Sequence, residues 1–469
     1  MDMDIENIAK VICDFIWSFP LLIALFGVGV YFSFKLDFLQ IRHAKRACRH
    51  ILNSKKLAEN GSIIGDISNF ASLCTALAAT LGTGNIVGIA VAVSVGGAGT
   101  LFWLIVSSFF SLATKYCEGL LAIKYRIIRS DKKMAGGPMY YIEKGLGSKL
   151  LAKMFAVLGA IVALVGTGTL VQTNSIAAAA TSFGVPIYVT SIVLTVIVAM
   201  VTFGGIHRIA EIAEKVVPIM SVLYIGAAII ILALKIETIP NALYLIVHEA
   251  FAPQAVVGGG IGACIIHTIQ IGVSRGIFCH EAGLGSAAIA SAAAKVKNPT
   301  EQGLICMIGA FLSIVICLIT GLVLITTAEE TQILSRGYNI PETLLTAHAF
   351  GLGLHLPQLG NHIVNTSILF FAFTSIIGWN YYGEKCVQYA FSTKAIMPYK
   401  VLYIFFVVVG PFLNIKTAFI LADIVIGLMA IPNIIAIIAL RREIIEETNK
   451  TLVIDSIMSE NNDEYGKFC

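Results

Sequence analysis

The stretch GVSRGIFCHEAGLG, residues 272–285, sets four glycines together with an Arg, a His and a Glu inside a long apolar run. A second interruption, ATLGTGN at residues 79–85, places two glycines around a Thr and ends in Asn. Glycine weakens a helix, and inside a bilayer unpaired backbone groups survive only where they line a cavity. Both stretches therefore predict broken membrane helices.

Composition places the rest of the chain in a membrane. The 469 residues are 57% hydrophobic and 13% charged, with a mean hydropathy of +0.86, whereas soluble domains carry about 25% charged residues. The acidic start, residues 1–6, lacks the basic region of a cleaved signal peptide, so we expect the first apolar segment to be retained. A bilayer span needs about 20 apolar residues of helix. We predict an all-α polytopic membrane protein with about eleven transmembrane helices, near 11–34, 67–95, 100–123, 151–172, 185–203, 216–235, 258–294, 304–327, 361–383, 401–415 and 417–440.

The positions of Lys and Arg predict the orientation. Loops on the cytoplasmic side are enriched in these residues, and the loop 41–56 carries Arg42, Lys45, Arg46, Arg49, Lys55 and Lys56. Alternate loops after it are also basic. We therefore expect an outside N-terminus, a cytoplasmic C-terminus, and a multi-pass protein of a prokaryotic plasma (inner) membrane. No basic run alternates with aromatic residues, which argues against nucleic acid as a partner.

The two interruptions fall at corresponding places. If the first span is set aside, they lie in the first and sixth of the remaining ten, so each opens a set of five. Five spans per set makes the sets inverted, and inverted repeats with broken helices are typical of secondary transporters. We predict an extra N-terminal helix and basic cytoplasmic loop at 1–60, repeats at 61–240 and 241–440, and a cytoplasmic tail at 441–469.

The breaks also predict the chemistry. The N-terminus of a half-helix favours a carboxylate, and freed carbonyls with nearby hydroxyls suit a small hard cation such as Na⁺. No Gly-x4-Gly-Lys-Ser/Thr loop is present, so ATP is not expected. An intramembrane metalloprotease is disfavoured because Ala252 and Leu284 stand where His-Glu-x-x-His requires its second His. A channel is disfavoured because no ring of like charges is visible. We predict a transporter and not an enzyme.

At these motifs the sequence resembles the alanine or glycine:cation symporter family. The resemblance covers roughly residues 60–440 and is carried by SLCTALAATLGTGNI (72–86), ATKYCEGLLAIKYR (113–126), GGPMYYI (136–142), QTNS (172–175), AEKVVP (213–218), RGIFCHEAGLGSA (275–287), GWNYYGEKC (378–386) and LMAIPN (428–433). It implies a leucine-transporter-type fold and symport of Na⁺ with alanine or glycine, with no cofactor beyond the coupling ion. Coupling to protons through Glu281 or His280 is the alternative.

The resemblance also implies a site. Thr83, Gly84 and Asn85 would hold the substrate carboxylate, and four further residues would line the pocket: Gln172, Phe278 as a cover, Ser375 near the amino group, and Trp379 beside the small side chain. By analogy with the same fold, the cation would be held by the carbonyls of Ala78 and Leu81 and the hydroxyls of Thr374 and Ser375.

The sequence leaves two interpretations open for several polar residues. Arg275 and Glu281 are expensive inside a bilayer, so we expect them to face a cavity or to pair with each other, as a gate or as a structural ion pair. His280 stands where the family usually has Asn, and we favour a packed polar neighbour over a pH-sensitive group. Lys115 and Glu118 are three apart, as in an exposed helical pair. The loop 328–360 is expected to be a solvated connector rather than a lid.

Overall fold

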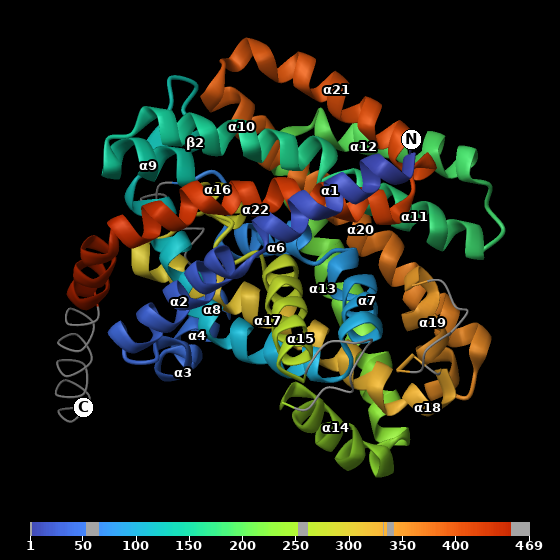
Figure 1. The fold of residues 1–469 in the computed structure, drawn as a ribbon. Coiled ribbons are helices and arrows are strands. Elements are labelled where there is room, and N and C mark those ends of the chain that lie inside the picture. The colour runs from blue at the N-terminus through green and yellow to red at the C-terminus, as the bar shows by residue number, and fades with distance from the viewer. Residues whose placement is uncertain (1, 53–64, 252–260, 332, 335–341, 452–469) are drawn as a thin grey trace, which may run out of the picture.

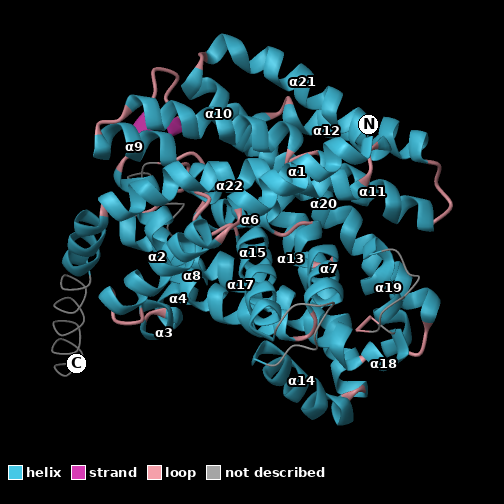
Figure 2. Cartoon of the chain, viewed as in Figure 1, coloured by secondary structure: helices cyan, strands magenta, loops and turns pink. Residues whose placement is uncertain are grey.

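The computed structural model describes residues 2–52, 65–251, 261–331, 333–334 and 342–451. Nearly all of these residues are helical, and the one small sheet among them pairs β1 (Ile127–Ile128) with β2 (Met134–Ala135) beside α9 (Figure 2). The all-α prediction is confirmed for this part of the chain.

The chain opens with a helical pair and proceeds to the first broken span. The bounds up to the end of the first predicted repeat are α1 (Asp2–Ile16), α2 (Phe19–Lys35), α3 (Leu39–Arg42), α4 (Ala44–Leu52), α6 (Asn69–Thr80), η1 (Thr83–Asn85), α7 (Val87–Gly96), α8 (Gly99–Lys124), α9 (Pro138–Leu146), α10 (Lys149–Val165), α11 (Leu170–Ser182), α12 (Ile187–Thr202) and α13 (Gly205–Leu234). Ser68 begins α6 by accepting a hydrogen bond from the Ala71 N–H at 3.0 Å, a normal N-cap.

The second half contains the second broken span and the C-terminal helices. Its elements are η2 (Ile236–Thr238), α14 (Ile239–Phe251), α15 (Ile261–His280), α16 (Ser286–Ser291), α17 (Pro299–Thr326), α18 (Ala328–Thr331), α19 (Glu342–Gly353), α20 (Pro357–Ala390), η3 (Thr393–Ala395), α21 (Ile396–Val409), η4 (Gly410–Phe412) and α22 (Ile415–Ala439). In the view of Figure 1, α6, α15 and α22 run through the middle of the picture, and α14, α18 and α19 lie toward its lower side.

Span lengths agree with a membrane protein. Among the described residues, eight helices are long and apolar enough to cross a bilayer, or nine if the bent pair Asn69–Thr80 and Thr83–Gly96 counts as one span. The outer faces of α12 and α13 carry exposed large apolar side chains such as Ile192 (64%) and Val222 (72%), as expected of helices that face lipid. The count of eleven spans and the inverted repeat stay predictions.

The expectation for the loop 328–360 is wrong, and the start of the predicted tail is packed against the rest of the protein. The region 328–360 is not simply a solvated connector, because α19 buries Leu345 and Phe350 and Thr346 donates a hydrogen bond to the Ile86 carbonyl at 3.2 Å. The first residues of the predicted tail also pack on the core, since Thr448 shares a 2.8 Å hydrogen bond with the Tyr116 hydroxyl. The glycines at 258–260 lie outside the described residues.

Candidate functional site

The first break lies where the sequence predicts it. Helix α6 ends at Thr80, the chain unwinds through Leu81 and Gly82, and α7 continues at an angle of 66° to the first half. All three residues of η1 are buried. The bend frees the last carbonyls of α6 and the first N–H groups of α7 from intrahelical pairing.

The predicted cation ligands meet at this bend. The Ser375 hydroxyl, from the middle of α20, lies 3.1 Å from the Ala78 carbonyl oxygen and 3.3 Å from the Leu81 carbonyl oxygen. The Thr374 hydroxyl instead donates to the Phe371 carbonyl of its own helix at 3.0 Å. Ser375 is therefore the side chain that brings an oxygen to the two freed carbonyls. Three clustered oxygen donors fit a hard monovalent cation, which prefers oxygen ligands.

Gln172 holds the next part of the break. It lies in the first turn of α11, and its Oε1 accepts a hydrogen bond from the Thr83 N–H at 3.2 Å. The Thr83 hydroxyl is buried without a hydrogen-bond partner. The predicted pocket residues Thr83, Gln172 and Ser375 thus lie close together at the first break. Among these three side chains, the Thr83 hydroxyl is the buried group left without a hydrogen-bond partner.

The Asn85 side chain forms hydrogen bonds within the first break and to α17. Its Oδ1 accepts from the Gly82 N–H at 3.2 Å, and its Nδ2 donates to the Ser313 hydroxyl at 2.7 Å. The same serine donates to the Cys279 carbonyl at 2.9 Å. The Asn85 amide is therefore engaged in closing the first break and, through Ser313, in connecting it to the end of α15.

Phe278 covers the break from the second broken span. A Cβ added to Gly84 would lie 2.7 Å from the Phe278 ring, so only glycine allows the ring this close. The Arg275 guanidinium lies 5.5 Å from the Phe278 ring centroid, at a distance suited to a cation–π contact. The aromatic cover predicted for Phe278 is compatible with this position.

The predicted pair of Arg275 with Glu281 is wrong. Arg275 instead forms an ion pair with Asp423 of α22 at 2.8 Å, and the Asp423 carbonyl accepts from the Trp17 indole at 2.9 Å. The reason is local geometry: Arg275 lies well inside α15, whereas Glu281 follows its last residue and turns toward α8 and α16.

The second break lies at the end of the glycine-rich stretch 272–285. Residues 272–280 stay helical, and the chain unwinds over 281–285 before α16 begins. Glu281, Gly283 and Gly285 adopt left-handed backbone conformations with φ of 54°, 90° and 76°, which glycine allows and other residues rarely adopt. Only the last two glycines of the motif therefore make the break.

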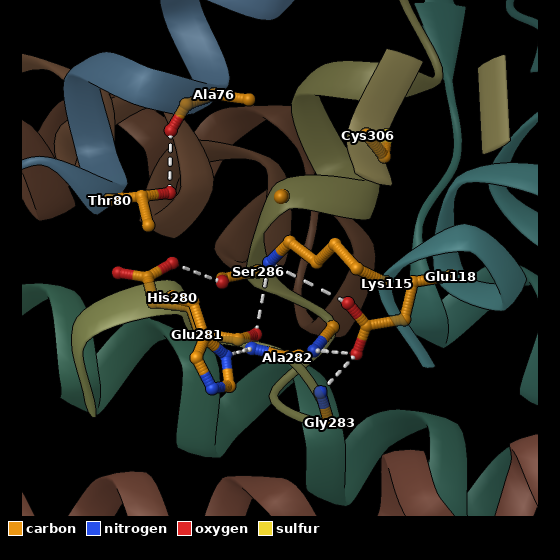
Figure 3. Close-up of polar contacts among 12 residues, drawn as sticks. Ala76, Thr80, Lys115, Glu118, His280, Glu281, Ala282, Gly283, Ser286 and Cys306 are labelled. Carbon is orange, nitrogen blue, oxygen red and sulfur yellow. Dashed lines mark hydrogen bonds and ion pairs between the residues drawn. The ribbon is translucent and has the colours of Figure 1, made fainter. Parts of the chain in front are cut away.

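Lys115 and Glu118 hold this second break, as Figure 3 shows. Glu118 Oε1 accepts hydrogen bonds from the Gly283 and Gly285 N–H groups at 2.8 and 2.9 Å and from Asn433 Nδ2 at 2.8 Å. Lys115 donates to the Glu281 carbonyl at 3.0 Å and lies 3.7 Å from Glu118. Both side chains are at most 3% exposed, so the expected exposed pair is wrong.

Two further predicted residues lie beside the second break. Trp379, one turn beyond Ser375, is 1% exposed and packs edge-on against Tyr382 at 5.4 Å; its indole N–H has no hydrogen-bond partner. His280 is fully buried and its Nδ1 accepts the Ala282 N–H at 3.1 Å. His280 is thus a packed polar neighbour, as favoured from the sequence.

Sequence reasoning missed the groups that satisfy the breaks from other helices, namely Glu118, Asp423, Ser313 and Asn433. The position of Glu118 along its helix could have indicated that it is buried. Glu118 lies six residues before the end of α8, which is about 9 Å at about 1.5 Å per residue, and Lys115 lies further from that end. The other three partners depend on which helices are neighbours.

Comparison with known proteins is consistent with this geometry. The model of the sodium:alanine symporter family matches residues 2–455. The sodium/alanine symporter AgcS of Methanococcus maripaludis is 42% identical over 452 residues, which cover 95% of this chain and 97% of the relative. The probable sodium/glutamine symporter GlnT of Bacillus subtilis is 34% identical over 446 residues, covering 94% and 90%.

A solved structure shares the fold. The substrate-bound outward-open state of a Na⁺-coupled sialic acid symporter matches with a TM-score of 0.51 and 15% identity, covering 90% of this chain and 82% of that chain. Together, the family match over nearly the whole length and the identity to AgcS fix the class of the protein. The chain is a multi-pass membrane transporter that belongs to the sodium:alanine symporter family.

Proposed function

We propose that this protein carries small neutral amino acids, alanine and glycine, together with Na⁺ by alternating access. One observation carries the proposal: the Ser375 hydroxyl lies within 3.3 Å of both the Ala78 and Leu81 carbonyls at a helix break. A bound Na⁺ would take these three oxygens as ligands. Each is uncharged, so the site gains no net negative charge that would favour a divalent ion.

The substrate site adjoins the cation site. The N–H groups at the start of α7 carry the positive end of a helix dipole, which suits the carboxylate of an amino acid. The unpaired Thr83 hydroxyl supplies one more donor, and Phe278 closes over Gly84. A ring this close to the break would limit the size of the substrate side chain, and we therefore propose alanine and glycine as substrates. The relatives AgcS and GlnT are named as a sodium/alanine and a probable sodium/glutamine symporter, which supports sodium and an amino acid as the transported pair.

The proposal also includes the repeat organisation, the transport movement and the orientation in the membrane. The segments 61–240 and 241–440 are the two inverted repeats, 1–60 is an added helix and loop, and 441–469 is cytoplasmic. Rocking of one helical bundle against the other would expose the two breaks to either side in turn. The basic loops support an N-terminus outside and a C-terminus in the cytoplasm, and the proposed location is a prokaryotic inner membrane.

Uptake of labelled alanine into proteoliposomes tests the proposal. An inward Na⁺ gradient should drive accumulation, and Ser375→Ala should raise the Na⁺ concentration for half-maximal uptake about tenfold, which corresponds to about 1.4 kcal/mol. Ser367→Ala is the matched control, because that buried serine of α20 donates only to the Ile363 carbonyl of its own helix at 2.8 Å. Uptake that is independent of Na⁺, or equally affected by both variants, would contradict the Na⁺ site.

A further inference from the structure

Glu281 presents a buried carboxyl group that forms no ion pair with any described residue. Its side chain is 4% exposed, and the Ser286 hydroxyl donates to its Oε2 at 2.5 Å, as drawn in Figure 3. Throughout the described part of the chain, no Lys, Arg or His side chain forms an ion pair with it, because Arg275 pairs with Asp423 and Lys115 with Glu118.

The ionisable neighbours of Glu281 have partners of their own. Glu118 Oε1 accepts from two backbone N–H groups and from Asn433, contacts that favour the ionised form of Glu118, and the Lys115 ammonium lies 3.7 Å from the Glu118 carboxyl group. His280 is neutral, because its Nδ1 accepts the Ala282 N–H and so carries no proton there. None of these three groups supplies a positive charge in excess.

The other groups that face Glu281 are uncharged. They are the Tyr382 phenol and the Trp379 indole of α20, with the Cys306 thiol of α17 near Tyr382. The Tyr382 hydroxyl and the Trp379 N–H are buried without hydrogen-bond partners. The nearby Glu118 Oε2 is also buried and unpartnered. A buried carboxylate with no ion-pair partner is costly, and such a group takes up a proton instead.

We propose that Glu281 is a proton-binding site, separate from the Na⁺ site, and that its carboxyl group is protonated in this conformation. The proton comes from the aqueous phase and converts the carboxylate to the neutral acid, with no other bond made or broken. The neutral acid can both donate and accept, so it matches the Ser286 hydroxyl. This site goes beyond the proposed function and holds whichever amino acid is carried.

A small cavity lies beside the second break, next to Lys115. A narrow space of about 10 Å³, enough for about one water molecule, is lined by Lys115, Thr80, Ser72 and Gln302. The Gln302 Oε1 has no hydrogen-bond partner, and its Nε2 donates to Ser72 at 3.4 Å. Water in this cavity would connect the Lys115 side of the second break with the start of α6.

Infrared spectroscopy of the purified protein tests the site without substrate or Na⁺. At neutral pH, the difference spectrum of wild type minus Glu281→Gln should contain the C=O stretch of one protonated carboxylic acid, and raising the pH should remove that band from the wild type. His280→Asn is the matched control, because Asn also offers an acceptor oxygen to Ala282, and it should keep the whole band.

Two results would overturn the proposal. One is a difference spectrum that contains only carboxylate bands, which would mean that Glu281 is ionised. The other is a band that persists in Glu281→Gln and disappears in Glu118→Gln, which would place the proton on Glu118. If Glu281→Gln does not fold, Glu281→Asp keeps an acid at this position and should shift the frequency of the band; an unshifted band would equally contradict the site. Failure of alanine uptake affects neither readout.

Discussion

Both helix breaks leave backbone groups without intrahelical partners, and the two breaks differ in whether neutral or charged side chains pair with those groups. At the first break, neutral groups satisfy the freed backbone: Ser375, Gln172 and Asn85. At the second break, a carboxylate and an ammonium do so, from Glu118 and Lys115. A hydrogen bond between neutral groups contributes about 0.5–1.5 kcal/mol, so the first break can exchange partners with an arriving ligand at low cost.

The backbone shows the same contrast. The second break contains three left-handed residues, Glu281 among them, whereas none of residues 81–86 has a positive φ. A non-glycine residue in the left-handed region costs about 1–2 kcal/mol, and it persists only when its surroundings hold it. The second break is therefore a fixed platform, and the first is the part suited to binding and release.

Glu118→Gln should give the largest effect, because it removes the charge that compensates a buried ammonium. Removing one partner of a buried ion pair costs about 3–5 kcal/mol. We expect a large fall in the thermal unfolding midpoint, measured in detergent by size-exclusion chromatography of heated samples.

Two variants make this measurement specific. Lys115→Met combined with Glu118→Gln should recover part of the loss, since it leaves no buried charge unpaired. Glu211→Gln removes one partner of an exposed pair with Lys215, 65% and 71% exposed, and should change stability by less than about 1 kcal/mol. Equal midpoints for Glu118→Gln and Glu211→Gln would show that the second break does not depend on charge.

Gln172→Ala is the corresponding change at the first break. It leaves the buried Thr83 N–H without its acceptor, at a cost of about 1–3 kcal/mol. The thermal midpoint should fall less than for Glu118→Gln, while alanine uptake should fall strongly because the break loses its shape. Ser175→Ala, on the same helix, removes a hydroxyl that donates only to the Val171 carbonyl and should leave uptake nearly unchanged. If Gln172→Ala lowered the thermal midpoint more than Glu118→Gln does, the first break would be the more rigidly held of the two, contrary to our interpretation.

The sequence predicts the breaks better than their partners. Glycine clusters inside apolar runs are local signals, so residues 79–85 could be located directly, and the family resemblance brought Ser375 to the Ala78 and Leu81 carbonyls. The cost of a charge inside a bilayer predicts that Arg275 faces a cavity or pairs with Glu281, yet its partner, Asp423, is 148 residues away. Pairing of that kind depends on which helices are neighbours and how they are rotated, and neither follows from periodicity.

The extent of the second break shows a related limit. The four glycines of residues 272–285 have two structural roles: Gly283 and Gly285 lie in the break, whereas Gly272 and Gly276 lie within α15. A Cβ on Gly272 would lie 2.6 Å from the Thr100 carbonyl oxygen, so this glycine allows close packing against α8. Composition alone does not separate glycines that end a helix from glycines that let two helices approach.

Gly283→Ala should give a smaller loss that tests the backbone contrast. Gly283 has a φ of 90°, and an added Cβ would meet chiefly the end of the Leu25 side chain, which can move. The cost is therefore mainly conformational, about 1–2 kcal/mol, and the N–H that Glu118 accepts is retained. The thermal midpoint should fall by less than for Gln172→Ala, and no fall would mean that the left-handed turn is not held rigidly.

Gly88→Ala should change the thermal midpoint least, and it should raise the midpoint rather than lower it. Gly88 lies in α7, has an ordinary helical φ, and no atom lies within 4 Å of an added Cβ. Alanine in a helix interior is favoured over glycine by about 0.5–1 kcal/mol, so the thermal midpoint should rise slightly. If the first broken span must flex at α7 during transport, the same substitution should slow uptake although it stabilises the protein. Unchanged uptake would confine the flexible part to the unwound residues 81–86, where the neutral hydrogen bonds lie.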